Sequence, residues 1–485
     1  MTPGFETSRV TFDAFNDGLP ASTRLSARQR LELLCDPGSA KVIRSTVQSR
    51  RIGSRAQAGD GVVAAAGTVD GRPVFCYAQD AQFIGGSLGE AHAETIVRVL
   101  QLAKDAQVPV IAFVESAGAR VQEATAALGG YGRIFRETIA LSRTVPQISI
   151  IAGTSAGGGS YAPALTDFIV MTKDSKMFLT GPGVVQAATG EEIDATALGG
   201  PAVHARNGVC QFVVPTDIDA AFLSRELLSY LPQNTSELPP SAEPQGPTMD
   251  NPGTFVPRET RRVYDVRDVV RGIVDAGRLL EVAPRWARNI VTAFARLEGR
   301  PVGVVANQPH HLGGVIDAAA SQKAARFVST CDRFRVPLVV LVDTPGFLPG
   351  SRQERGGVIW HGSKLLRAFG GATVPRVSVV LRQAYGGAYI TMNARDLGAD
   401  FAFAWPRARI GIMAATQAVG ITHRADIAAA ANPAERRQEL ADEYAAQHQS
   451  AYAAARDGFI DEVISPDETR ERLCSALTTF VGKRQ

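Results

Sequence analysis

The two halves of the chain repeat one another, and this duplication constrains the fold more than any other feature. Residues 108–118 read VPVIAFVESAG, and residues 336–346 read VPLVVLVDTPG. Residues 145–161, VPQISIIAGTSAGGGSY, return at 374–390 as VPRVSVVLRQAYGGAYI. Because the offset stays near about 228 residues, the pattern indicates one fold duplicated in tandem.

The copies share glycine-rich turns that follow apolar, strand-like runs. They share no reactive side chain in these turns, because Ser155 of the first copy corresponds to Ala384 of the second. A function that both copies serve is therefore expected to use backbone amides rather than a side-chain nucleophile.

The composition excludes several function classes. The 485 residues are 45% hydrophobic and 20% charged, which is ordinary for a soluble globular protein. A net charge of +3 does not favour binding to nucleic acid or to an anionic membrane. No apolar run approaches the roughly 20 residues of a membrane-spanning helix, and no secretory signal is visible, so a cytoplasmic location is expected.

Neither a disulfide framework nor a metal site is expected. The five cysteines are dispersed without a CxxC pair and are predicted to be reduced core thiols. His310 and His311 are adjacent but have no acidic residue at metal-site spacing nearby. Asp343 and Glu354 are possible acid and base groups, although turn hydrogen bonds explain them equally well. No P-loop lysine motif indicates ATP chemistry.

Strands and helices are predicted to alternate, which indicates an α/β layer fold. Apolar runs at 63–69 and 74–77 flank a two-residue turn and predict a hairpin. The predicted helices span residues 27–34, 90–105, 131–142 and 433–458, and the predicted buried strands span residues 108–114 and 148–152.

A proline-rich stretch divides the two copies. Residues 233–257 hold six prolines among Ser, Glu and Gln, which favours a linker with little capacity for a core. The predicted domains are therefore residues 1–245 and 246–485. Residues 1–25 are predicted to be a polar lead-in with little regular structure.

Residues 153–157, GTSAG, match the nucleophile elbow of serine hydrolases and follow a predicted strand. Downstream histidines such as His204, His361 and His423 would have to complete a triad around Ser155. Because the second copy has alanine at the corresponding position, the serine-hydrolase interpretation is the weaker one.

The glycine turns themselves are candidate oxyanion holes. Helices are expected to begin at Gly157–Gly158 and at Gly387–Ala388, where free N–H groups and the helix dipole favour a negative oxygen. The turns at Gly118–Ala119 and Gly346–Phe347 would supply a second amide to each hole. Tight helix–strand packing is a second explanation for these glycines. Two holes in one chain indicate a reaction between two enolate-like partners.

These motifs resemble those of a known family, the carboxyltransferase (β) subunits of biotin-dependent acyl-CoA carboxylases. The resemblance covers nearly the whole chain, and it implies two tandem crotonase-like (ClpP/crotonase) β-β-α spiral domains related by internal duplication. Its landmarks include residues 85–90 (GGSLGE), 116–123 (SAGARVQE), 303–309 (GVVANQP), 345–349 (PGFLP) and 384–389 (AYGGAY).

The resemblance implies transfer of a carboxyl group from carboxybiotin to the α-carbon of a short acyl-CoA. Acetyl-CoA or propionyl-CoA would give malonyl-CoA or methylmalonyl-CoA, precursors of fatty acids or polyketides. The carboxybiotin is presented by a partner α-subunit with biotin carboxylase and biotin carboxyl carrier functions, and the biotin takes the α-proton. The expected assembly is a dimer at least, in which the N-half of one subunit faces the C-half of its neighbour, and usually a hexamer.

The resemblance also assigns roles to residues. Gly157–Gly158 are expected to hold the thioester enolate, and Gly387–Ala388 the biotin oxygen. In the family, the position of Ile390 lines the acyl pocket. An isoleucine there is similar to enzymes that accept acetyl-CoA as well as propionyl-CoA. The remaining residues expected to bind substrate are Gly118, Ala119, Arg120, Gly346, Phe347 and Tyr389, and no metal is expected.

Departures from the family pattern occur at Ala117, Trp360-His361 and Gln383, and they bear on substrate identity and on the partner-contacting surface. The sequence is also compatible with a biotin-dependent decarboxylase, which runs the same chemistry in reverse, and with a non-catalytic scaffold. It shows neither a biotin attachment motif nor an ATP-binding module, so a partner chain is expected to supply both functions.

Overall fold

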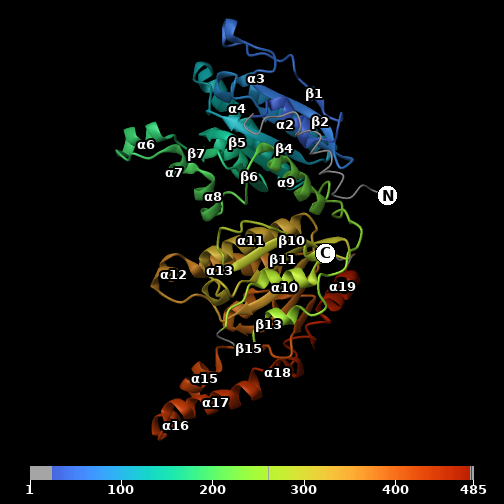
Figure 1. Cartoon of the computed structure of the whole chain (residues 1–485). Coiled ribbons are helices and arrows are strands. Elements are labelled where there is room, and N and C mark those ends of the chain that lie inside the picture. The colour runs from blue at the N-terminus through green and yellow to red at the C-terminus, as the bar shows by residue number, and fades with distance from the viewer. Residues whose placement is uncertain (1–23, 260–261, 481, 483–485) are drawn as a thin grey trace.

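The computed structural model describes residues 24–259, 262–480 and 482, and most of the predicted lead-in at residues 1–25 lies outside them. Figure 1 shows two α/β bodies stacked along the molecule, the N-terminal one above the C-terminal one. The predicted α/β class and the duplication are confirmed, because each body contains an eight-stranded sheet with the same strand order.

In the N-terminal half the sheet order is β1-β2-β3-β4-β5-β6-β8, with β7 paired to β5. In the C-terminal half it is β9-β10-β11-β12-β13-β14-β16, with β15 paired to β13. The strands are β1 (Lys41–Ile43), β2 (Val62–Val69), β3 (Arg72–Gln79), β4 (Val110–Ser116), β5 (Gln147–Ala156), β6 (Phe168–Thr172), β7 (Lys176–Phe178), β8 (Phe212–Val214), β9 (Leu279–Glu281), β10 (Ile290–Leu297), β11 (Arg300–Asn307), β12 (Leu338–Thr344), β13 (Arg376–Tyr385), β14 (Phe401–Ala404), β15 (Arg409–Gly411) and β16 (Glu462–Val463).

Helices cover both faces of each sheet. The helices are α2 (Ala27–Leu34), α3 (Glu90–Ala106), α4 (Ala124–Leu141), α5 (Gly158–Ala164), α6 (Pro182–Thr189), α7 (Ala195–Gly199), α8 (Pro201–Asn207), α9 (Asp217–Tyr230), α10 (Val266–Ile273), α11 (Ala318–Arg333), α12 (Ser351–Arg355), α13 (Val358–Gly371), α14 (Gly386–Thr391), α15 (Ala415–Thr422), α16 (Arg424–Ala429), α17 (Pro433–His448), α18 (Ala451–Arg456) and α19 (Thr469–Thr479). None of the helices in the described part of the chain is both long and apolar enough to cross a membrane.

Local sequence explains the first sheet well. All seven residues of β4 are buried, as expected for a central parallel strand covered on both faces. Val69 of β2 pairs with Arg72 of β3, so the hairpin turn contains only Asp70 and Gly71. Their φ angles of 50° and 75° are those of a two-residue turn that matches the twist of the strands.

The helix predicted over residues 433–458 is wrong in its middle, where two residues separate α17 from α18. The carbonyl of Gln449 accepts a hydrogen bond from the N–H of Ile410 at 2.9 Å. The side chain of Ser450 then caps the start of α18. Pairing with the strand β15 therefore breaks a helix that its own sequence would continue.

The proline-rich stretch has no helix or strand between α9 and the short turn at Pro252, yet it is attached along its length to the C-terminal half. Arginines bind its carbonyl groups: Arg335 donates to Ser236 at 2.9 Å, Arg296 to Pro240 at 3.0 Å, and Arg470 to Gln245 at 2.9 Å. The domain boundary predicted between residues 245 and 246 lies in this segment and stays a prediction.

The two halves share one hydrophobic core. Phe294 of β10 is fully buried, and its ring lies 6.0 Å from that of Phe168 in β6 and 5.7 Å from that of Tyr230 in α9. Arg333 in α11 donates to the carboxylate of Asp167 at 2.6 Å across the same boundary. All five cysteines are free and buried, as predicted.

We predict that Phe294→Ala lowers the free energy of unfolding by about 3–5 kcal/mol, because it leaves a cavity where the two halves meet. Urea denaturation followed by fluorescence measures the change. Phe255→Ala is the control, since Phe255 is 36% exposed and should cost less than about 1 kcal/mol. A loss at Phe294 no larger than that of the control would contradict the shared core.

Candidate active site

The sheet register brings the predicted glycine turns together in each half. Parallel pairing places Ser116 of β4 beside Ser155 of β5, and Thr344 of β12 beside Ala384 of β13. Because parallel strands end at the same edge of a sheet, the turns that follow them are neighbours. A Cβ atom added at Gly118 would lie 3.3 Å from the carbonyl oxygen of Ala156.

In the N-terminal half, the two residues whose amides open the helix lie one position later than the predicted pair Gly157–Gly158. The N–H of Gly157 donates to the carbonyl of Phe178 at 3.1 Å. This N–H therefore already has an acceptor in the neighbouring strand β7. Gly157 has a φ of 59° and makes the turn into α5. The amides of this turn that open the helix belong to Gly158 and Gly159, since first-turn N–H groups have no acceptor inside a helix.

The turn at Ala119 presents a further amide. The N–H of Leu88 donates to the carbonyl of Gly118 at 2.8 Å, and the N–H of Arg120 donates to the carbonyl of Leu88 at 2.9 Å. Successive amides of an extended segment point in opposite directions, so the N–H of Ala119 points away from this pairing. It has no backbone acceptor among the residues that the structure describes.

The C-terminal half repeats this arrangement. Gly386, with a φ of 60°, is the counterpart of Gly157, and Gly387 and Ala388 follow in the first turn of α14. The N–H of Ile316 donates to Gly346 at 3.0 Å, which leaves the N–H of Phe347 on the opposite side. Within the described ranges this N–H also has no backbone acceptor.

The space around the two equivalent glycines, Gly158 and Gly387, differs. A Cβ atom added at Gly158 would lie 2.7 Å from the ring of Tyr131, a distance that requires the ring to move. A Cβ atom added at Gly387 would meet nothing closer than the ring of Phe347 at 4.0 Å, which is ordinary contact. The surface at Gly387 is exposed, so a ligand oxygen can approach its backbone.

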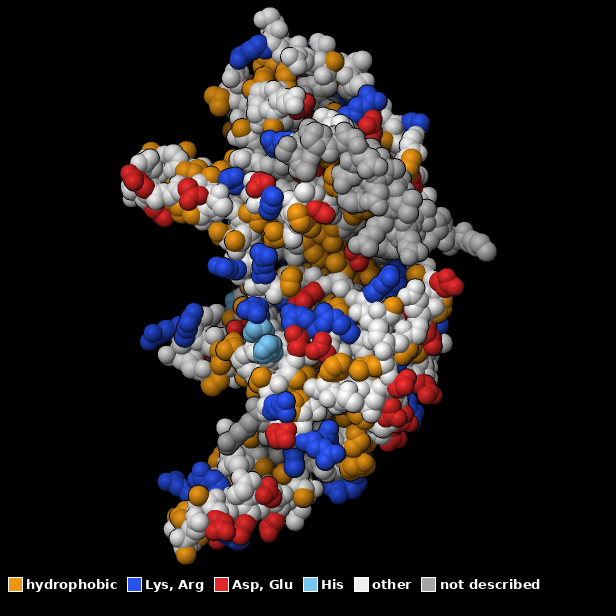
Figure 2. All heavy atoms as spheres, in the orientation of Figure 1, with side chains coloured by type: hydrophobic (Ala, Val, Ile, Leu, Met, Phe, Trp, Pro, Cys, Tyr) orange, Lys and Arg blue, Asp and Glu red, His pale blue; other side chains and the backbone are white. Residues whose placement is uncertain are grey.

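Exposed aliphatic residues lie close to both turns. In the N-terminal half Leu179, which follows β7, is 53% exposed beside Gly157. In the C-terminal half Ile390 and Ile412 are 47% and 78% exposed, whereas the hydroxyl of Tyr389 donates to the carbonyl of Phe459 at 3.0 Å. The α6–α7 and α15–α17 arms begin at these positions and project on the same side of the molecule, with the projecting α12 between them (Figures 1 and 2).

Arg120 is buried in this structure, and its binding role stays a prediction. Its side chain is fully buried and forms ion pairs with Asp60 at 2.7 Å and with Glu123 at 2.8 Å. It also donates to the carbonyl of Ser87 at 3.0 Å. Since removing one member of a buried ion cluster leaves uncompensated charge, Arg120 holds the 116–123 segment in place.

The serine-nucleophile interpretation is wrong. Ser155 is fully buried, and its hydroxyl donates to the carbonyl of Gly159 at 2.8 Å. His204, which follows it in the chain, instead contacts the carbonyl of Met177 through Nε2 at 2.6 Å. The hydroxyl therefore stabilises the turn into α5 and has no base beside it.

Asp343 lies beneath the C-terminal turn and is also fully buried. Burial raises the pKa of its carboxyl group to about 6, and the charge of Arg382 opposes this rise. Arg382 lies 3.1 Å from the carboxylate, and the hydroxyl of Tyr264 donates to it at 2.8 Å. Glu354 is exposed on α12, so the two residues do not form an acid–base pair at one site.

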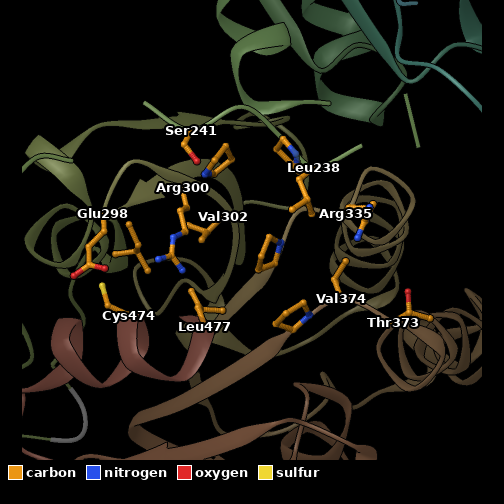
Figure 3. Close-up of a pocket in the computed structure, with 15 residues that line it drawn as sticks. Leu238, Ser241, Glu298, Arg300, Val302, Arg335, Thr373, Val374, Cys474 and Leu477 are labelled. Atoms are coloured by element: carbon orange, nitrogen blue, oxygen red, sulfur yellow. The ribbon is translucent and has the colours of Figure 1, made fainter. Parts of the chain in front are cut away.

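A cavity lined mainly by apolar side chains lies away from these turns. It has a volume of about 200 Å³, and Figure 3 shows it lined by residues that include Leu238, Arg300, Val374 and Leu477. Val374 precedes β13, so the cavity lies at the opposite edge of the sheet from the glycine turns. Among the described residues, no group of three potential metal-binding side chains is found.

Comparison with known proteins gives a consistent result. Residues 21–485 match the family model of the carboxyl transferase domain. The chain is 46% identical over 467 residues to the methylmalonyl-CoA carboxyltransferase 12S subunit of Propionibacterium freudenreichii, with 95% of this chain and 89% of that protein covered. It is 45% identical over 471 residues to the propionyl-CoA carboxylase carboxyltransferase subunit of Haloferax mediterranei, with 95% and 91% covered.

A solved structure agrees with the architecture. The crystal structure of transcarboxylase 12S, described as a hexamer with methylmalonyl-coenzyme A bound, superposes with a TM-score of 0.92 and 44% sequence identity. The match covers 99% of this chain and 94% of that one. This confirms the predicted duplicated crotonase-like fold.

We predict opposite effects for two glycine-to-alanine changes at equivalent helix starts. Gly158→Ala should lower the free energy of unfolding by about 1–3 kcal/mol, because its Cβ collides with Tyr131. Gly387→Ala should leave stability unchanged or raise it by about 0.5 kcal/mol, because alanine fits there and reduces the entropy of the unfolded chain. Urea denaturation measures both, and equal losses would show that the described packing around Gly158 is incorrect.

Proposed function

The chain belongs to the carboxyl transferase domain family, and we propose that it is the carboxyltransferase component of a biotin-dependent acyl-CoA carboxylase. It would transfer the carboxyl group of carboxybiotin to the α-carbon of a short acyl-CoA. The observation that carries this proposal is the pair of amide-lined helix starts, one in each half, with no reactive side chain shared between them.

The chemistry explains why two such sites are needed. Carboxybiotin, held on a partner subunit, supplies the carboxyl group and the base for the α-proton. This chain then has to stabilise two carbonyl oxygens that become negative, one on the thioester and one on the biotin ring. Each N–H donor aimed at such an oxygen typically contributes about 3 kcal/mol to transition-state stabilisation.

We assign the N-terminal hole to the thioester enolate, with donors from Gly158 and Ala119. The C-terminal hole, with donors from Gly387, Ala388 and Phe347, is assigned to the biotin oxygen. The exposed aliphatic side chain of Ile390 is proposed to contact the acyl chain and to accommodate both acetyl-CoA and propionyl-CoA.

Both candidate holes belong to one chain, and the proposed assembly pairs the holes of different subunits. We propose that the N-terminal hole of one subunit faces the C-terminal hole of another, so that the functional unit is at least a dimer, and that dimers form a hexamer. The similarity to transcarboxylase 12S, whose crystal structure is described as a hexamer, supports this arrangement. The biotin-carrying α-subunit is the proposed partner, and the cytoplasm the proposed location.

We predict that the protein, reconstituted with a biotinylated α-subunit, ATP and bicarbonate, carboxylates acetyl-CoA and propionyl-CoA. Incorporation of labelled bicarbonate into acid-stable product measures the reaction. Ser155→Ala should retain activity within about threefold, because the hydroxyl only bonds Gly159, whereas a serine nucleophile would cost thousands-fold or more. Absence of carboxylation with every acyl-CoA and competent partner would refute the proposed function.

Release of labelled CO2 from methylmalonyl-CoA in the presence of biotinylated partner tests the reverse direction. Decarboxylation without any net carboxylation under ATP and bicarbonate would favour a decarboxylase. This measurement uses the same protein preparation, so the two directions are compared directly.

A further inference from the structure

Two buried hydroxyl groups connect the turns of the N-terminal hole. The hydroxyls of Ser116 and Tyr131 lie 3.4 Å apart, and the two residues are 0% and 5% exposed. The N–H of Gly118 donates to the Ser116 oxygen at 3.2 Å. A Cβ atom added at Gly159 would lie 3.5 Å from the Tyr131 oxygen, so this hydroxyl lies against the start of α5. The contacts from Gly118 through Ser116 to Tyr131, the 116–131 bridge, therefore connect one turn with the other.

Tyr131 also fixes the helix start through its ring. The ring approaches Gly158 so closely that a Cβ atom added there would lie 2.7 Å away, and the hydroxyl reaches the next residue, Gly159. Tyr131 belongs to α4, which packs against both α3 and α5. A rigid helix outside the turn thus determines where the first two amides of α5 lie.

Burial raises the pKa of Tyr131, while its hydrogen bonds with Ser116 and Gly159 oppose this rise. The hydroxyl is therefore protonated at neutral pH. Because unsatisfied buried polar groups are costly, the two hydroxyls and the Gly118 amide stabilise one arrangement of the turns.

The C-terminal half has a counterpart of the hydrogen bond between Gly118 and Ser116, whereas the described residues there show no counterpart of the Tyr131 hydroxyl. The N–H of Gly346 donates to the hydroxyl of Thr344 at 3.3 Å, as Gly118 does to Ser116. In the described part of the chain no tyrosine hydroxyl contacts Thr344, and the ring of Phe347 would lie 4.0 Å from a Cβ added at Gly387 and 3.3 Å from one added at Gly362 of α13. The N-terminal turns are thus joined by hydrogen bonds and the C-terminal turns by an apolar ring.

We propose that Tyr131 and Ser116 are positioning residues of the N-terminal hole, whose bridge sets the separation between the amides of Ala119 and Gly158. The inference rests on the proposed function for its effect on the reaction, but the bridge itself can be tested without turnover. The two halves would then differ with their ligands. The turns that bind the thioester oxygen are joined by hydrogen bonds, whereas the turns that bind the biotin oxygen are joined by the apolar ring of Phe347.

The kinetic test uses Tyr131→Phe in the reconstituted holoenzyme. We expect kcat for acyl-CoA carboxylation to fall about 10- to 100-fold with KM within about twofold, because small misplacements of donors mainly affect the transition state. Release of the carboxyl group from carboxybiotin without acyl-CoA should stay within about twofold, since it depends on the C-terminal hole. Unchanged kcat, or equal loss of both reactions, would overturn the proposal.

The matched control is Tyr230→Phe, which removes the hydroxyl of another buried tyrosine, one that stacks on Phe294. It should leave both reactions within about twofold of the unmodified protein. Ser116→Ala removes the other hydroxyl of the 116–131 bridge. The double variant of Ser116 and Tyr131 should be no slower than the Tyr131 variant alone, because both changes break one connection. Additive losses would contradict a single bridge.

The test without turnover is hydrogen exchange of the peptides that contain Gly118 and Gly159. In Tyr131→Phe these amides should exchange at least about fivefold faster, while the turn at Gly346 is unaffected. If no acyl-CoA is carboxylated but exchange changes in this way, the proposed function fails and the bridge stands. If exchange is unchanged, the bridge is refuted whatever the activity.

Discussion

Parallel pairing of two neighbouring strands is the constraint on which this structure depends. The registers of β4 with β5 and of β12 with β13 bring two turns to the same sheet edge in each half. Each turn then presents an amide that the sheet itself does not use, at Ala119 in one half and at Phe347 in the other. The site is therefore a property of backbone topology, and duplication of the topology duplicates the site.

Side chains diverge around this common backbone. The N–H of Glu115 donates to Gln79 at 3.0 Å, and that of its counterpart Asp343 donates to Asn307, the residue equivalent to Gln79, at 3.2 Å. In the first half the paired cations are Arg24, before α2, and Arg30, within α2, whereas in the second half the cation is supplied by β13. A buried carboxylate needs a cation nearby, but either chain segment can supply it.

Much of the fold could be predicted from sequence, because hydrophobic periodicity and turn residues are local signals. The helix at residues 27–34 and the Asp70-Gly71 hairpin are examples. The contacts that the sequence did not predict are made between residues far apart in the chain. The N–H of Gly157 donates to Phe178 of β7, and the buried Arg120 pairs with Asp60. Local sequence patterns do not indicate such partners, and the contact of the Tyr131 hydroxyl with Ser116 is of the same kind.

We propose that backbone amides, rather than side chains, stabilise the reacting oxygens. Replacing Phe347 by its α-hydroxy acid, phenyllactic acid, changes one amide into an ester, which removes the N–H, keeps the ring and weakens the Gly346 carbonyl as acceptor of the Ile316 N–H. Carboxyl transfer in the reconstituted enzyme should fall by about 100-fold or more with the fold intact. A rate within about twofold of the unmodified enzyme would contradict it.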